Sequence, residues 1–250
     1  MAHEFDIVRA VLLEATPDEV WESVATAPGQ ATWFGLVAPI DPSSPIVTAW
    51  EPGRRLQLQI PPAPDGSIQS FEYLISARDG ATTVLRFRHS GSGGDWGEEF
   101  QPITAAGWEM YLRTLAQYHA HVAGRPATFV EAEAPASSSV ADAWPVLLGV
   151  PCGGGATGAE RVDVGSPVDV SHPRLPRMEG VIDLLTDHWV GVQTPDDLIR
   201  FHGRWSLGMP VAVSHRHDAD GLDPSGARKA WESWLARAFA ASPAAEGARD

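Results

Sequence analysis

The sequence repeats itself at a constant interval, and this repeat limits what the chain can fold into more than any other feature. The run WEMYL from Trp108 to Leu112 returns as WESWL from Trp231 to Leu235, 123 residues further along. Trp21 returns as Trp144 at the same interval. A single larger domain gives no reason for one interval at both its first and its last helical segment, so the pattern predicts a duplicated unit.

Length and charge fit two ordinary globular domains. The chain has 250 residues, and 18 Lys and Arg against 32 Asp and Glu give a net charge of −14, which repels nucleic acid and anionic membranes. The single cysteine, Cys152, excludes an intrachain disulfide and a multi-cysteine zinc site. No leader pattern and no apolar run of membrane-spanning length occurs. We therefore expect a cytoplasmic protein with no nucleic-acid partner and no membrane span.

The first half predicts an antiparallel meander followed by one long helix. Thr16 and the residues after it form a helix start, and Asp79-Gly80 is a hairpin turn. The glycine-rich stretch 90–97 is predicted as a loop. Period-two and period-3.6 patterns predict strands over 5–14, 46–50, 55–60, 71–77 and 82–89, and a helix over 104–123.

The second half repeats this order. It begins with a strand over 128–133 and ends with a helix over 224–240, while Ser137 to Ser139 are expected to cap a helix. The predicted boundaries are 1–125 for the first domain, 126–240 for the second and 241–250 for a flexible tail. Between the terminal elements, strands are predicted over 162–170, 180–185, 188–193, 198–205 and 211–217.

Four runs in the first half carry a family resemblance. They are TPDEVWESVATAPGQATWFG, VTAWEPGRRLQLQI, TTVLRFRHSG and GWEMYLRTLAQYHAHVAGR. Together they resemble the START-like superfamily of polyketide cyclases and lipid-transfer proteins, in the branch similar to the activator of Hsp90 ATPase. The resemblance is weaker over 126–240, where Trp33-Phe34 has no counterpart and Cys152 to Gly155 take its place.

The resemblance implies an α+β fold of two helix-grip units. In each unit a curved antiparallel sheet wraps around a long C-terminal helix, and the space between them holds an apolar or amphipathic ligand. The fold alone does not define an activity.

Strand alternation predicts which side chains of the first unit face that space. The same residues also suit a solid core, and both interpretations stay open at this point. The candidate ligand-binding residues, including an expected rim, are Trp33, Phe34, Leu58, Phe71, Tyr73, Phe87, His89, Trp96, Trp108, Tyr111, Leu112 and Leu115.

Histidines supply the candidates for polar chemistry. His89 ends an inward-facing strand pattern, and His215 takes the same place in the second half, so both are candidate catalytic residues. His215 and His217 share a strand face ahead of Asp218 and Asp220, which is a weak metal pattern; we expect no metal. The glycines after Cys152 are not a phosphate loop, because the only lysine is Lys229.

Two function classes follow from these residues. The first is a non-catalytic protein that binds a small apolar or amphipathic molecule without a cofactor. The second is an enzyme similar to polyketide cyclases and aromatases, with His89 or His215 as general acid or base. A co-chaperone that activates an ATPase follows only from the name of the family branch. The sequence defines neither the ligand nor the oligomeric state.

Overall fold

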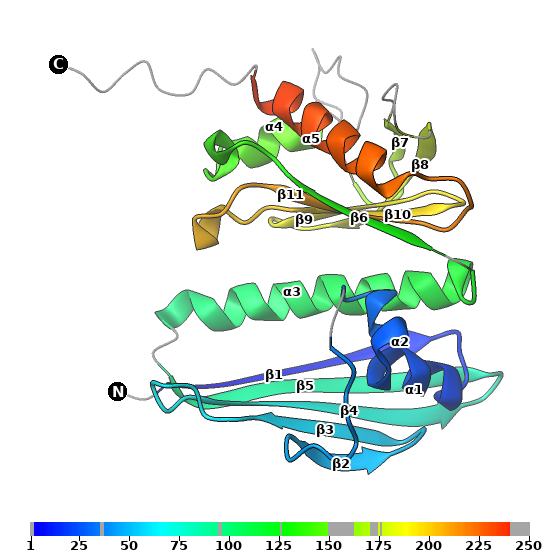
Figure 1. Cartoon of the computed structure of the whole chain (residues 1–250), viewed down its shortest axis with the longest axis vertical. Coiled ribbons are helices and arrows are strands. Elements are labelled where there is room, and N and C mark those ends of the chain that lie inside the picture. The colour runs from blue at the N-terminus through cyan, green and yellow to red at the C-terminus, as the bar shows by residue number, and fades with distance from the viewer. Residues whose placement is uncertain are drawn as a thin grey trace. The chain divides into compact units, whose positions relative to one another are not determined.

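The computed structural model describes residues 3–35, 38–94, 97–125, 127–149, 163–170, 175 and 177–240 (Figure 1). The chain forms two compact units, and the boundary between them falls between Ala123 and Gly124. The predictions at Trp96, at Cys152 and the glycines after it, and in the tail 241–250 lie outside the described residues.

The first unit is a five-stranded antiparallel sheet with helices on one face (Figure 1). Its strand order is β1-β5-β4-β3-β2, so the first strand pairs with the last and the others form a meander. The elements are β1 (His3–Leu13), α1 (Pro17–Ala25), α2 (Ala27–Ala31), β2 (Val47–Glu51), β3 (Arg55–Ile60), β4 (Ile68–Arg78), β5 (Thr82–Gly94), α3 (Gly97–Gln117) and a π-helical turn (Tyr118–Val122).

The start of α1 is fixed by a capping box. The backbone N–H of Glu19 donates to the Thr16 hydroxyl at 3.4 Å, and the backbone N–H of Thr16 donates to the Glu19 carboxylate at 2.8 Å. Pro17 suits the first helical turn, where its missing N–H is not needed. The helix buries Val20, Trp21 and Val24 against the sheet. The predicted helix start is confirmed.

Two predicted boundaries in the first unit are wrong. Residues Ser90–Gly94 are part of β5 instead of a loop, because they pair with both neighbouring strands: Ser90 lies opposite Asp6 and Ser70. Helix α3 begins at Gly97 instead of residue 104. Its first turns carry exposed side chains such as Gln101, but Phe100 already packs on Phe5 of β1 with ring centroids 5.1 Å apart, so contact with the sheet begins before the predicted periodic segment.

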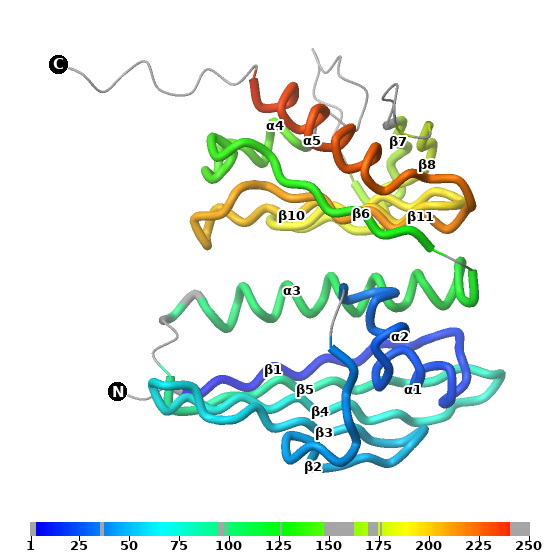
Figure 2. Tube along the Cα trace, viewed as in Figure 1, coloured from blue at the N-terminus to red at the C-terminus, as the bar shows by residue number. Residues whose placement is uncertain are grey.

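The second unit is a six-stranded antiparallel sheet in the order β6-β11-β10-β9-β8-β7, with α4 and α5 on one face (Figures 1 and 2). Its first and last long strands pair, as in the first unit. The elements are β6 (Thr128–Glu133), a 3-10 turn (Ala136–Ser138), α4 (Ala143–Gly149), β7 (Pro167–Val170), β8 (Met178–Leu185), β9 (Trp189–Gln193), β10 (Asp197–His202), a 3-10 turn (Trp205–Leu207), β11 (Ala212–His217) and α5 (Pro224–Ala240).

The serine run in the second unit does not cap a helix as expected. Ser138 ends a 3-10 turn, and its hydroxyl accepts the backbone N–H of Val211 at 3.0 Å and donates to the carbonyl of Pro135 at 2.8 Å. It therefore ties the end of β6 to the start of β11. Strand β10 ends at His202, three residues before the predicted end, and a 3-10 turn follows.

The predicted α+β class is confirmed, since each unit has the helix-grip arrangement that the resemblance implies. The strand register also gives equivalent positions. His89 lies opposite Ile7 and Phe71, while His215 lies opposite Val130 and Ile199. None of the helices in the described part of the chain combines the length and apolar character of a membrane span.

The two hydrophobic cores have no residue in common, and this predicts independent folding. We expect a protein of residues 1–125 alone to unfold in one cooperative transition in urea, monitored by tryptophan fluorescence, and to keep its near-UV circular dichroism. A 1–125 protein without a cooperative transition would contradict this expectation.

Candidate functional site

In the first unit a tryptophan from the long helix bonds to a histidine of the sheet. The indole N–H of Trp108 donates to Nδ1 of His89 at 3.0 Å, and His89 Nε2 lies 2.9 Å from the amide oxygen of Gln69. Because an indole N–H only donates, Nδ1 of His89 must accept, so the proton of the neutral ring is on Nε2 and is donated to Gln69. Trp108 and His89 are 7% and 4% exposed.

The second unit contains the same pair at the equivalent positions. The indole N–H of Trp231 donates to Nδ1 of His215 at 3.0 Å. The rings meet edge to face in both units, with centroid separations of 5.8 Å for the first pair and 5.7 Å for the second. The repeat that is visible in the sequence therefore preserves a helix-to-sheet hydrogen bond.

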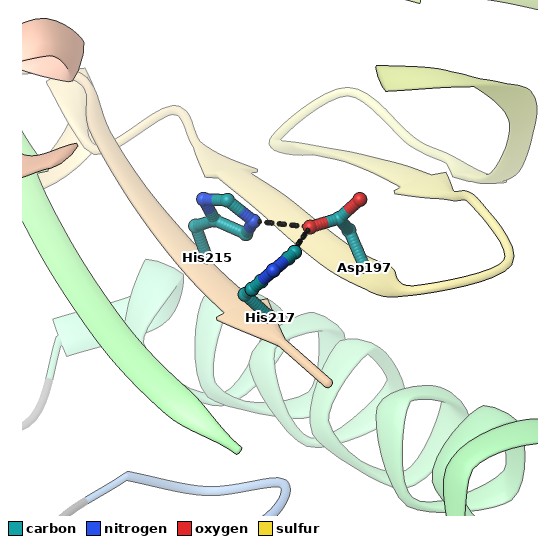
Figure 3. A group of neighbouring side chains, drawn as sticks. All are labelled: Asp197, His215 and His217. Atoms are coloured by element: carbon teal, nitrogen blue, oxygen red, sulfur yellow. Dashed lines mark hydrogen bonds and ion pairs between the residues drawn. The ribbon is translucent and has the colours of Figure 1, made fainter. Parts of the chain in front are cut away.

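The partner of His215 is a carboxylate instead of an amide. Asp197 Oδ1 lies 2.7 Å from His215 Nε2 and 2.6 Å from His217 Nδ1, and the Thr194 hydroxyl donates to Oδ2 at 2.6 Å (Figure 3). Burial alone would raise the pKa of Asp197, but the hydrogen bonds from His215 and Thr194 outweigh it and lower the pKa to about 2. The carboxylate is therefore ionised at neutral pH.

These three side chains are close enough for a metal, yet their hydrogen bonds do not suit one. The ligand atoms of Asp197, His215 and His217 all lie within 4.8 Å of one another. Trp231 occupies Nδ1 of His215 as a donor, so Nε2 of the neutral ring carries the proton and has no lone pair for a metal ion. The three side chains form a hydrogen-bonded cluster in which two imidazoles contact one carboxylate oxygen.

An open hollow of about 640 Å³ lies beside this cluster. It is formed where β11 ends and α5 begins, and His217 is the member of the cluster that reaches it. Its lining residues are His217, Asp220, Gly221, Leu222, Asp223, Gly226 and Ala227.

The structure brings the predicted lining residues of the first unit together around Trp108. The ring of Phe34 is stacked on Trp108 with centroids 5.3 Å apart, Phe87 lies 4.1 Å from Trp108, and Phe71 lies 4.3 Å from His89. These rings pack directly against one another. Buried members of the predicted set are Trp33, Tyr73, Phe87, His89, Trp108, Leu112 and Leu115; half-buried members are Phe34, Leu58, Phe71 and Tyr111.

One predicted rim residue has a structural partner. Trp33 is 4% exposed, and its indole N–H donates to the backbone carbonyl of Ser23 at 2.8 Å, which ties the segment after α2 to α1. An open hollow of about 530 Å³ in the first unit lies elsewhere and contains the ion pair between Arg88 and Asp6, 2.7 Å apart. None of the predicted ligand-binding residues that the structure describes lines it.

The two histidines proposed from the sequence as acid or base have no free ring nitrogen. Both nitrogens of His89 are engaged by Trp108 and Gln69, and both nitrogens of His215 by Trp231 and Asp197. A ligand hydrogen bond to His89 would require the loss of its bond to Gln69. Each histidine therefore serves to bind the tryptophan of the long helix to the sheet.

Sequence reasoning missed Gln69 and Asp197. Strand register places both residues. Gln69 pairs with Gly91, which lies two residues beyond His89, and Asp197 pairs with His217, which lies two residues beyond His215. The register of β10 and β11 depends on the long connection between them, so the spacing in the sequence does not place Asp197 beside the histidines.

Comparisons with known proteins describe the fold. No protein-family model matches the sequence, and no curated protein matches it either. The solved Aha1 dimer from Colwellia psychrerythraea is 17% identical, with a TM-score of 0.37, over 46% of this chain and 96% of that one. DynU16 of the dynemicin biosynthetic locus is 17% identical, with a TM-score of 0.39, over 92% and 94%.

A third similar structure is BexL, the di-domain ARO/CYC of the BE-7585A biosynthetic pathway. It is 13% identical, with a TM-score of 0.34, over 90% of this chain and 92% of that one. A similar fold does not by itself define what a protein binds or acts on.

Buried histidines make stability depend on pH. Burial lowers the pKa of His89, His119 and His202 to about 4 each, below the value of about 6.5 expected in the unfolded chain. Between these values the unfolded chain binds more protons than the folded one. The contribution of these neutral rings to the free energy of unfolding is therefore fully present above about pH 6.5. It is lost as the pH falls towards 4. Urea unfolding at a series of pH values measures this.

His89→Gln supplies the control for this pH dependence, because glutamine does not titrate. We expect its free energy of unfolding to fall less steeply than that of the parent between about pH 6.5 and pH 4.5. Equal slopes for parent and variant would contradict the assignment of His89 as a buried neutral ring.

Proposed function

We propose that the first unit binds a small apolar or amphipathic molecule between its sheet and α3. The supporting observation is a group of half-buried apolar side chains, Phe34, Leu58, Phe71 and Tyr111, which we call the aromatic face. They come from four different parts of the unit, and three of them contact the ring of Trp108. Exposed apolar surface gathered in one place is characteristic of a binding site.

The strand register continues this face along the sheet. Leu58 lies opposite Phe71, and both point towards the side covered by the helices. Below them Tyr73, Phe87 and Leu112 are buried, so the aromatic face is the outer boundary of the core. A ligand that covers it gains apolar burial of about 25 cal/mol per Å².

Phe34 is the side chain whose displacement opens the site. It follows α2, outside both the sheet and the long helix, and its ring is nearly parallel to that of Trp108, at an interplanar angle of 2°. It also touches Tyr111 with ring centroids 4.7 Å apart. A flat apolar ligand takes the place of the Phe34 ring on Trp108 and keeps the same stacking contact.

The polar part of the ligand stays near solvent in this proposal. Buried His89 is occupied by Trp108 and Gln69, so it acts by positioning the indole. Catalysis in the first unit would need a free acid or base. His89, the candidate from the sequence, has both ring nitrogens engaged in hydrogen bonds. The first unit is accordingly proposed as a binding module without a cofactor.

Fluorescence titration with the neutral dye Nile red tests this proposal. We expect the parent to bind the dye, and Phe71→Ser and Tyr111→Ser to weaken binding by about tenfold or more, since each removes a large apolar contact. Leu12→Ser is the matched control, because Leu12 is 58% exposed and lies on β1 away from the aromatic face. It should bind the dye like the parent.

Two results would reject the proposal. One is a parent that does not bind the dye. The other is dye binding that is weakened by Leu12→Ser as much as by Phe71→Ser. Circular dichroism of each variant shows that the fold is intact before binding is compared.

A further inference from the structure

The two units differ at one place on an otherwise shared scaffold. Each has a tryptophan from its long helix bonded to a strand histidine. Two residues beyond that histidine the first unit has Gly91, paired with Gln69, whereas the second has His217, paired with Asp197. An amide and a glycine in one unit thus correspond to a carboxylate and an imidazole in the other.

Proton positions in the second unit follow from its hydrogen bonds. Asp197 is ionised, and its Oδ1 lies 2.6 Å from His217 Nδ1. Two acceptors at that distance would repel each other, so Nδ1 of His217 carries the proton. The lone pair of the neutral His217 ring is then on Nε2. A carboxylate that accepts from Nδ1 also makes Nε2 a stronger hydrogen-bond acceptor.

Among the described residues, the hydrogen bond of the His217 ring is made through Nδ1, and Nε2 has no partner there. The residue is only 7% exposed, and the surface it retains lines the open hollow of about 640 Å³. The side chain that carries this nitrogen therefore borders a space large enough for a small molecule.

The walls of the hollow indicate what kind of molecule fits. Leu222 and Ala227 supply apolar surface. Asp223 is occupied as the cap of α5, where its carboxylate accepts the backbone N–H groups of Ser225 at 3.1 Å and Gly226 at 3.0 Å. Asp220 is an exposed carboxylate, which disfavours an anionic ligand. The walls therefore favour a neutral molecule that has apolar surface and one hydrogen-bond donor.

We propose that the second unit holds a separate ligand site, in which His217 Nε2 accepts a hydrogen bond from the hydroxyl of a small amphipathic alcohol or phenol. The O–H bond of the ligand stays intact, so the ligand stays neutral and His217 keeps its proton on Nδ1, against Asp197. Asp197 is the positioning residue.

The first unit makes the same helix-to-sheet connection without these two residues. The first unit fastens its helix to its sheet with Trp108, His89 and the neutral amide of Gln69. Burying an ionised carboxylate and a second imidazole costs desolvation free energy that the first unit avoids. A functional role at the hollow accounts for that cost.

Carbethoxylation of the full-length chain by diethyl pyrocarbonate tests the site, because the reagent reacts with an accessible neutral imidazole nitrogen. Peptide mapping by mass spectrometry gives a rate for each histidine. We expect His217 to react about tenfold or more faster than His89 and His215, whose Nε2 atoms are protonated and bonded. Excess phenol, used as the probe ligand, should slow the reaction of His217 alone.

Matched variants separate positioning from folding. Asp197→Asn should slow the reaction of His217 by about tenfold or more, because a neutral amide makes the imidazole less basic at Nε2 than the carboxylate does. Gln69→Asn, at the equivalent position of the first unit, should leave the rate at His217 unchanged. Phenol protection is measured on the parent, so it does not depend on whether Asp197→Asn folds.

Two results would overturn the proposal. One is a parent in which His217 reacts no faster than His215. The other is a parent in which phenol does not slow the reaction of His217. Neither result depends on dye binding by the first unit, so the two proposals fail separately.

Discussion

In both units the donation of an indole N–H to Nδ1 of a strand histidine joins the long helix to the sheet. Tryptophan has one polar atom, which only donates, and burying it without a partner costs about 1–3 kcal/mol. Trp108 and Trp231 therefore fix the rotation of α3 and α5 on their sheets. The same bond fixes the tautomer of His89 and of His215.

Each candidate site depends on this bond. In the first unit it holds Trp108 at the centre of the rings that form the aromatic face. In the second unit it directs the N–H of His215 at Asp197, which then orients His217 towards the hollow. The same contact thus supports an apolar surface in one unit and a polar cluster in the other.

The sequence predicts the scaffold better than the sites. The repeat of Trp108 as Trp231, the cap at Thr16 and most strands depend on local patterns, and the structure shows them. Alternation also indicates which side chains face the helix. It does not indicate whether rings such as Phe34 fill the space, and it does not find Asp197, because these contacts depend on register across distant strands and on helix rotation.

The central claim is that the indole N–H groups determine the histidine tautomers. Nitrogen-15 NMR of the histidine rings in the whole protein tests it most directly, because it distinguishes a protonated Nε2 from a protonated Nδ1. The account predicts that His89 and His215 both carry the proton on Nε2 at neutral pH, with Nδ1 accepting from Trp108 and Trp231. A proton on Nδ1 of either ring would contradict it.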